Sequence, residues 1–196
     1  MRGKRIIIAM AAVLLGGLGY WEIPSSAKDA SEATAIPAAT VADYVHSVIE
    51  ADRTFYTIHV VERLQAKGVV AATENWRVAN TLPLPAQFLR ESADLAARTG
   101  SRIGYRLISL WPINKENGPA DEFERAGLKD VQENQGRAYT GILARGGERV
   151  FRAVYSDRAV SQACIGCHNA HPNSPKHDFK PNDVMGAIVI SIPLGQ

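Results

Sequence analysis

Five consecutive residues, Cys164-Ile165-Gly166-Cys167-His168, contain both cysteines of the chain. Two thiols separated by two residues, with a histidine directly after the second, form the C-x-x-C-H pattern of c-type haem attachment. Each thiol then closes a thioether on one vinyl group of the porphyrin, and the histidine binds the iron. The sequence therefore predicts one covalent haem c, bonded to Cys164 and Cys167, with His168 as the proximal axial ligand.

Two other uses of the cysteine pair remain open. The thiols could form a disulfide or a redox dithiol, which usually opens a helix after a βα turn, but no such strand and turn clearly precede Cys164. They could also form half of a zinc site that His171 and His177 complete, although this set lacks the usual long spacer between ligand pairs. The spacing favours haem over both alternatives.

The N-terminal segment, residues 1–27, has the pattern of an export signal. Basic residues at positions 2, 4 and 5 precede an apolar or glycine run at 6–20, and small residues ending at Ala27 offer a cleavage site. The alternative is an uncleaved membrane anchor, because residues 6–23 are just long enough to span a bilayer. We therefore expect the domain on the periplasmic side of the cytoplasmic membrane, or in the soluble periplasm after cleavage.

The remaining chain predicts a tether and one domain. Residues 28–39 are small and polar, as in a flexible tether, and the domain should occupy residues 40–196. Hydrophobic periodicity predicts helices at 40–67, 85–98 and 120–134 and strands at 102–110, 138–145, 149–155 and 184–192. A hairpin turn is expected at Gly146-Gly147. This order predicts an α+β fold with a mostly antiparallel sheet flanked by helices, preceded by the long N-terminal helix. The haem-binding segment is expected to be a connection with little regular structure.

Charge excludes one class of partner. The chain has 22 basic and 20 acidic residues, for a formal net charge of +2. Such a balance lacks the excess of basic residues that attracts nucleic acid, so we do not expect nucleic acid as a partner.

The function of a haem depends on the group that faces the iron opposite His168. At 100° per residue an apolar stripe of the first helix contains Val41, Tyr44, Val45, Val48 and Phe55, and this stripe is predicted to face the core. His59 lies in the middle of that stripe and is the leading candidate for the sixth ligand. An ordinary satisfied or exposed histidine is the alternative.

Other residues are weaker candidates. His46 lies away from the stripe and is expected in solvent, His171 is too close to His168, and His177 and Met185 complete the set of possible ligands. Tyr56 could donate a hydrogen bond in the haem pocket. Arg53 could pair with a propionate there.

Several stretches resemble a family of exported, single-haem c-type proteins with a PAS-like or Cache-like sensor fold. They are residues 50–56, 82–88, 105–114, 164–175 and 183–187, within a similarity that covers residues 40–193. The resemblance implies a PAS-like sheet, a haem attached at Cys164 and Cys167, and His168 as an axial ligand. It also implies that a sensing member without a transmitter domain signals through a partner protein.

Two functions follow from these patterns. The first is one-electron transfer between partner proteins outside the cytoplasm, which predicts a six-coordinate iron. The second is a haem-based redox or gas sensor that signals through a partner protein, which predicts an open or exchangeable sixth position. The lone, anchored haem favours the first. We expect no enzymatic activity, because a distal acid/base pair for peroxidase chemistry is not recognisable.

Overall fold

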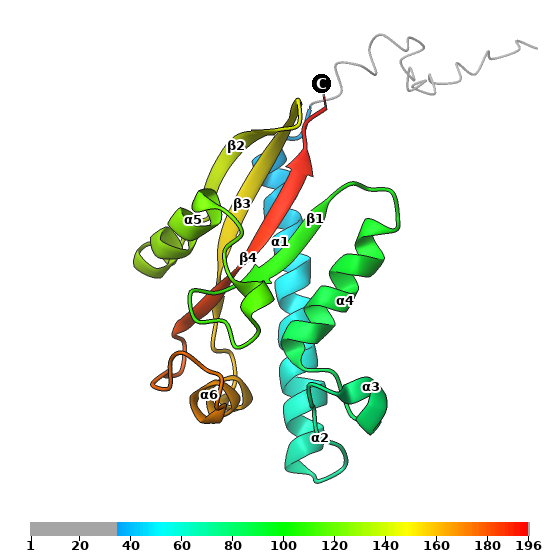
Figure 1. Cartoon of the computed structure of the whole chain (residues 1–196). Helices are drawn as coiled ribbons and strands as arrows, with labels where there is room; N and C mark the ends of the chain where they lie inside the picture. Colours follow the sequence, from blue (N-terminus) through cyan, green and yellow to red (C-terminus); the bar gives the residue numbers. More distant parts are fainter. Residues whose placement is uncertain (1–34, 196) are drawn as a thin grey trace, which may run out of the picture. The chain divides into compact units, whose positions relative to one another are not determined.

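Four strands form one antiparallel sheet in the computed structural model, which describes residues 35–195 (Figure 1). The strands are β1 Gly104–Ile108, β2 Tyr139–Arg145, β3 Glu148–Arg158 and β4 Val184–Pro193. Their order in the sheet is β1-β4-β3-β2, so the last strand pairs with both the first and the third. The longest pairing, β3 with β4, forms the centre of the sheet.

Helices precede and flank the sheet. The first helix, α1, continues through a π-helical segment into α2, and α3 to α6 follow along the chain. Their bounds are α1 Ala38–Phe55, the π-helical segment Tyr56–Glu62, α2 Arg63–Ala66, α3 Trp76–Ala79, α4 Pro85–Ala97, α5 Glu122–Glu133 and α6 Gln162–Ala170, with a 3-10 turn at Lys115–Asn117. The predicted α+β class and the long N-terminal helix are confirmed.

The two faces of the sheet have separate cores. Helices α1 and α4 cover one face, where Ile49 and Leu89 pack against Tyr155 of β3. Helix α5 covers the other, where Leu128 packs against Val154. Neighbouring residues of a strand point to opposite faces, which is why consecutive positions of β3 enter different cores. Burying each large apolar side chain contributes about 1.5–3 kcal/mol, so these cores account for much of the stability of the sheet.

The turn between β2 and β3 follows the glycine pair that the sequence indicated. Gly146 and Gly147 have φ angles of 58° and 85°. Two-residue hairpin turns of type I′ need positive φ at both positions, which glycine adopts without strain. The predicted hairpin is confirmed.

The predicted core-facing stripe of α1 is wrong. Tyr44, Val48 and Phe55 are 64%, 61% and 62% exposed. The buried side of the long helix carries Ala42, Ile49 and Arg53 in α1 and Thr57 in the π-helical segment instead. Hydrophobicity alone misidentified this side because two of its buried positions are polar and one is a small alanine.

The C-x-x-C-H motif also differs from its predicted local structure. Cys164 to His168 lie within α6, a helix of nine residues, whereas an irregular connection was predicted. A short helix containing a glycine shows too little amphipathic pattern to be recognised.

Within residues 35–195, no helix is both long and apolar enough to cross a bilayer. The predicted signal or anchor at 1–27 and most of the predicted tether at 28–39 lie outside the described residues.

Candidate functional site

Cys164, Cys167 and His168 occupy positions i, i+3 and i+4 of α6. Residues with this spacing lie close together on the surface of an α-helix. Cys164 is half-buried, Cys167 is exposed, and both are free thiols. His168 is half-buried. The helix thus brings two thiols and one imidazole together, where a single large ligand could contact all three.

A small apolar cluster and two hydrogen bonds of the Asn169 side chain hold α6 in place. Ile165 and Phe179 are buried in this cluster together with Met185. The ring of His168 meets the ring of Phe179 edge-on, with centroids 5.8 Å apart. The side chain of Asn169 donates to the carbonyl of Phe179 at 2.9 Å and accepts from its amide at 3.0 Å. Asn169 therefore positions Phe179, which in turn positions His168.

The imidazole of His168 suits a metal ligand. Burial lowers the pKa of His168, and the nearby positive charges of Arg53 and His171 lower it further. A lowered pKa keeps the ring neutral, which is the form that binds metals. Its Nδ1 atom is buried and has no hydrogen-bond partner among the described residues. These properties fit the predicted haem attachment.

The thiol of Cys167 does not suit redox catalysis. Although the residue as a whole is exposed, its sulfur is partly buried, and this burial raises the pKa of Cys167. Negative charge on Glu74 and on a Cys164 thiolate raises it further. Reactive dithiols need a lowered pKa, because the thiolate is the nucleophile. The electrostatics of α6 therefore disfavour the dithiol alternative.

The zinc alternative finds no support in the geometry. Across residues 35–195, no three His, Cys, Asp or Glu side chains are arranged to hold a metal ion. His171 instead contacts Glu74 through Nε2 at 3.3 Å. His177 lies 2.9 Å from the carbonyl oxygen of Asn169 through Nδ1. Both histidines of the hypothetical zinc set thus have other contacts.

Arg53 is a buried ion-pair residue. Its guanidinium binds both carboxylate oxygens of Asp157, once at 3.0 Å and once through a shorter contact. Arg53 and Asp157 are 8% and 7% exposed, and Arg53 Nε has no partner in the described part of the chain. The sequence identified Arg53 but not Asp157, although a charged residue in an otherwise buried stretch of β3 was a possible signal.

Tyr56 lies one position after α1 ends. Its hydroxyl donates to the carbonyl of Pro83 at 2.7 Å, and its ring stacks on Phe88 with centroids 4.4 Å apart. Burial raises the pKa of Tyr56, so the hydroxyl keeps its proton. In this arrangement the proton of Tyr56 is directed at Pro83.

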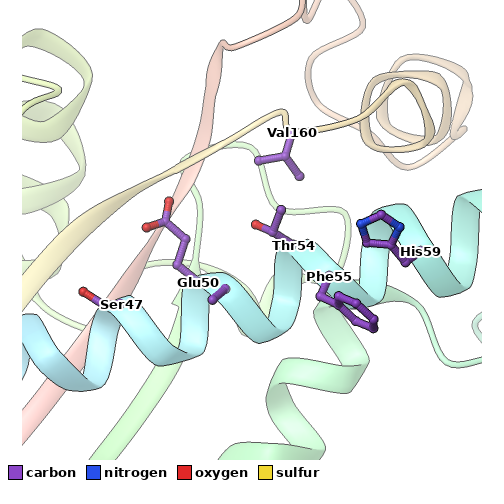
Figure 2. A pocket seen from close by; sticks show the side chains of 7 residues that line it. Ser47, Glu50, Thr54, Phe55, His59 and Val160 are labelled. Carbon is purple, nitrogen blue, oxygen red and sulfur yellow. The ribbon is translucent and has the colours of Figure 1, made fainter.

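His59 lines a shallow cavity of about 600 Å³ beside α1. The other lining residues are Ser47, Glu50, Ala51, Thr54, Phe55 and Val160. Figure 2 shows Val160, on the chain that leads into α6, across from Thr54 and His59 on the long helix. The ring of His59 is exposed and lies 4.9 Å from that of Phe55. None of the three motif side chains of α6 lines this cavity.

His46 and Met185 have structural surroundings. His46 was expected in solvent, which is wrong: only 14% of its side chain is exposed, and its ring stacks on Tyr155 at 4.0 Å. The cause is the rotated orientation of α1 described above. Met185 is 6% exposed within the cluster that holds α6.

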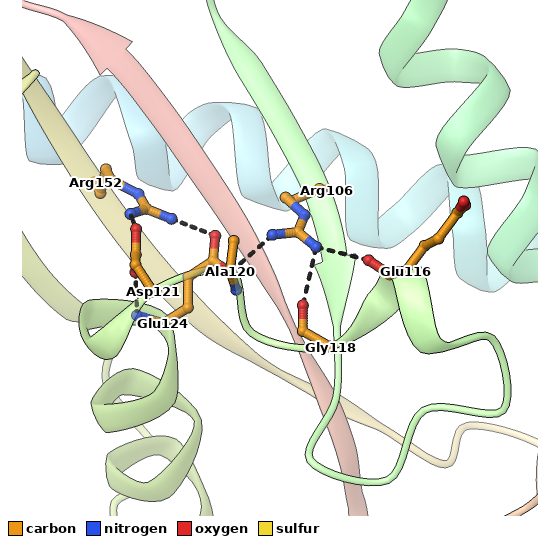
Figure 3. Close-up of polar contacts among 7 residues, drawn as sticks. All are labelled: Arg106, Glu116, Gly118, Ala120, Asp121, Glu124 and Arg152. Atoms are coloured by element: carbon orange, nitrogen blue, oxygen red, sulfur yellow. Dashed lines mark hydrogen bonds and ion pairs between the residues drawn. The ribbon is translucent and has the colours of Figure 1, made fainter. Parts of the chain in front are cut away.

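A second polar cluster lies on the α5 side of the sheet, beside a cavity of about 520 Å³ (Figure 3). Glu124 is 1% exposed and accepts from Arg106 at 2.8 Å and from the amide of Ala120 at 2.6 Å. Its other oxygen binds Arg152, which also binds Asp121. Because the charges pair with one another, this cluster anchors the start of α5 to the sheet.

Comparison with known proteins gives one family and one fold. A family model described as Tll0287-like matches residues 25–193. The crystal structure of the cyanobacterial heme-protein Tll0287 superimposes with a TM-score of 0.50 at 13% identity, covering 82% of this chain and 99% of that chain. At this identity the similarity shows the fold alone. A comparison with curated proteins found no match.

Proposed function

Since this chain belongs to the Tll0287-like family, we propose that it is a c-type haem protein that transfers single electrons outside the cytoplasm. The observation that carries the proposal is the grouping of two free thiols and a half-buried imidazole on α6. The fold shared with a protein described as a heme-protein supports the choice of cofactor.

The three motif residues of α6 each have a defined task in this proposal. Cys164 and Cys167 form the two thioether bonds, and His168 supplies the proximal imidazole. The cofactor supplies a one-electron iron couple. Because Cys167 is exposed, a group bonded to it has an edge near the protein surface. Such an edge favours electron exchange with a partner protein.

For the second axial position we favour His59. The other candidate imidazoles have contacts: His46 stacks on Tyr155, His171 faces Glu74, and His177 lies against a backbone carbonyl. The ring of His59 is exposed and contacts the ring of Phe55. Its imidazole is therefore available to bind iron.

The test of haem attachment uses the full chain, expressed in a bacterium that matures c-type cytochromes. After acid-acetone extraction the polypeptide should retain one porphyrin mass. Cys164→Ser combined with Cys167→Ser should remove it, whereas Ser161→Ala, next to the motif, should retain it. Extracted wild-type protein without added mass would exclude haem c and return attention to zinc or a dithiol.

Absorption spectra of His59→Ala test the second ligand. We expect the oxidised protein to change from low-spin to high-spin bands, because one strong ligand is lost. His177→Ala, which replaces another exposed imidazole, should leave the bands unchanged. Low-spin bands that survive in His59→Ala would exclude His59 as the ligand.

A sensing role is favoured by the π-helical segment Tyr56–Glu62, which contains His59. Such segments are rare and frequently occur at functional sites. If His59 binds the iron in only one redox state, this segment and the adjoining α1 would respond to that state. A carbon monoxide complex that forms readily in the reduced wild-type protein would favour sensing over electron transfer.

A further inference from the structure

The outer surface of α1 exposes large apolar side chains that its own fold does not use. Tyr44, Val48 and Phe55 are 64%, 61% and 62% exposed, and Ala51 is exposed beside them. Together with the half-buried Val41, these residues form what we call the α1 seam. The opposite side of the same helix packs on the sheet, so the seam is not part of the core.

The spacing of the seam is that of a two-stranded coiled coil. Its residues, Val41, Tyr44, Val48, Ala51 and Phe55, are separated by three, four, three and four positions. This 3-4 alternation is the a/d pattern of a heptad repeat, in which apolar residues meet the same positions of a partner helix. The pattern therefore favours, as the partner, a helix that carries the same seam.

Charge argues against a lipid surface as the occupant. The exposed charged residues of α1 are Asp43, Glu50 and Asp52, all of them acidic. Its single basic residue of the Lys/Arg type, Arg53, is buried in the pair with Asp157. Helices that lie on membranes carry Lys and Arg beside their apolar face, which α1 does not.

Charge permits a parallel arrangement. With Val41 and Val48 at a positions, Asp52 takes an e position and Ser47 a g position. In a parallel pair, Asp52 faces Ser47 of the second copy, so no like charges meet across the seam. The membrane anchor expected at 6–23 would also direct both helices the same way.

We propose that the α1 seam joins two copies of this chain into a parallel dimer. The seam extends about 21 Å along the helix, and a face about 10 Å wide gives a contact of a few hundred Å². This is smaller than the roughly 800 Å² per partner of a standard interface, so the dimer is weak in dilute solution. Confinement to one membrane raises the local concentration and stabilises it. Ala51 and Phe55 also line the cavity beside α1, so this end of the seam lies next to His59.

Cysteine cross-linking in membranes of cells that express the full chain tests the dimer. Val48→Cys places a thiol at an a position, outside the cavity beside α1. Leu95→Cys on α4 is the matched control, because Leu95 is 63% exposed and outside the seam. After mild oxidation, we expect the cross-linked dimer to be at least about five-fold more abundant for Val48→Cys than for Leu95→Cys. The parent protein gives the background from its own two cysteines.

A second variant pair checks that cross-linking reports the seam. Tyr44→Cys should also cross-link, and adding Val48→Glu should reduce this at least about five-fold by placing two carboxylates together. Adding Leu95→Glu should not reduce it. Equal cross-linking at Val48 and Leu95, or none at either seam position, would overturn the proposal. Seam cysteines shielded from a water-soluble maleimide without forming dimers would also overturn it, in favour of lipid or another protein.

Discussion

Arg53 and Asp157 face each other in an interior where neither side chain reaches bulk water. Removing one partner of a buried pair leaves the other charge uncompensated, which costs about 3–5 kcal/mol. We therefore expect Asp157→Ala to lower the free energy of unfolding by about that amount, measured by urea denaturation. Asp178→Ala removes a surface carboxylate and should leave the unfolding midpoint unchanged. Equal midpoints for both variants would show that the buried pair contributes little.

His46 predicts a pH dependence of stability. Burial lowers the pKa of His46 in the folded state, while Glu50 and Asp43 act in the opposite direction. Below about pH 6.5 the unfolded chain binds a proton at His46 that the folded protein resists, so stability falls as the pH decreases from there. Urea denaturation at pH 7.5 and 5.5 should show a smaller loss for His46→Gln than for the wild type. His177→Gln, at an exposed position, should retain the wild-type loss, and an unchanged loss in His46→Gln would contradict the assignment.

The motif residues could be proposed as one site from the sequence because they stand within five adjacent positions, and α6 brings them together. Cys164, Cys167 and His168 need no long-range information. Asp157 and Asn169 became visible only in three dimensions, because their partners lie far along the chain or in a loop without periodicity. Residue types within a local pattern can be found from sequence, whereas a buried polar partner depends on the fold.

At the level of elements, Gly186 fixes how closely β1 and β4 approach. A Cβ atom at Gly186 would lie 2.4 Å from the backbone oxygen of Ile108, which cannot rotate away. Gly186→Ala should therefore destabilise the protein by about 1–3 kcal/mol in thermal or urea denaturation. Gly104→Ala in β1 meets no atom within 4 Å and serves as the control. Equal stability of the two variants would contradict a close approach of the strands.

Elements with a strong period were predictable, and those without one were not. The strands and the hairpin followed from alternation and from the glycine pair at 146–147. The face of the long helix was misassigned because Arg53 in α1 and Thr57 in the π-helical segment are buried, so its most apolar stripe is not its buried one. That same mismatch leaves the α1 seam exposed. The stripe that was wrongly predicted to face the core is therefore the surface proposed for dimerisation.

For the whole molecule, the sequence predicted the α+β class but not the strand order. Placing β4 between β1 and β3 requires pairings such as Leu107 with Ile188, which no local pattern encodes. The order also explains where the segment with the C-x-x-C-H motif lies. The amide of Ala159 donates to the carbonyl of Asp183, and the amide of Asn182 donates back to the carbonyl of Ala159. These bonds join the two ends of the segment that contains α6.

Because the segment that contains α6 is joined at its two ends, we expect the sheet to fold without the cofactor. The two sheet cores contain no residue of α6, whose Ile165 belongs to a separate cluster with Phe179. Cys164→Ala combined with Cys167→Ala should therefore remove covalent haem yet unfold cooperatively. Hydrogen exchange measured by mass spectrometry should be faster than in the wild type for peptides from α6, while peptides from β3 and β4 keep their protection, because only the small cluster loses support. Loss of protection throughout the sheet would show instead that haem attachment is needed for the whole domain to fold.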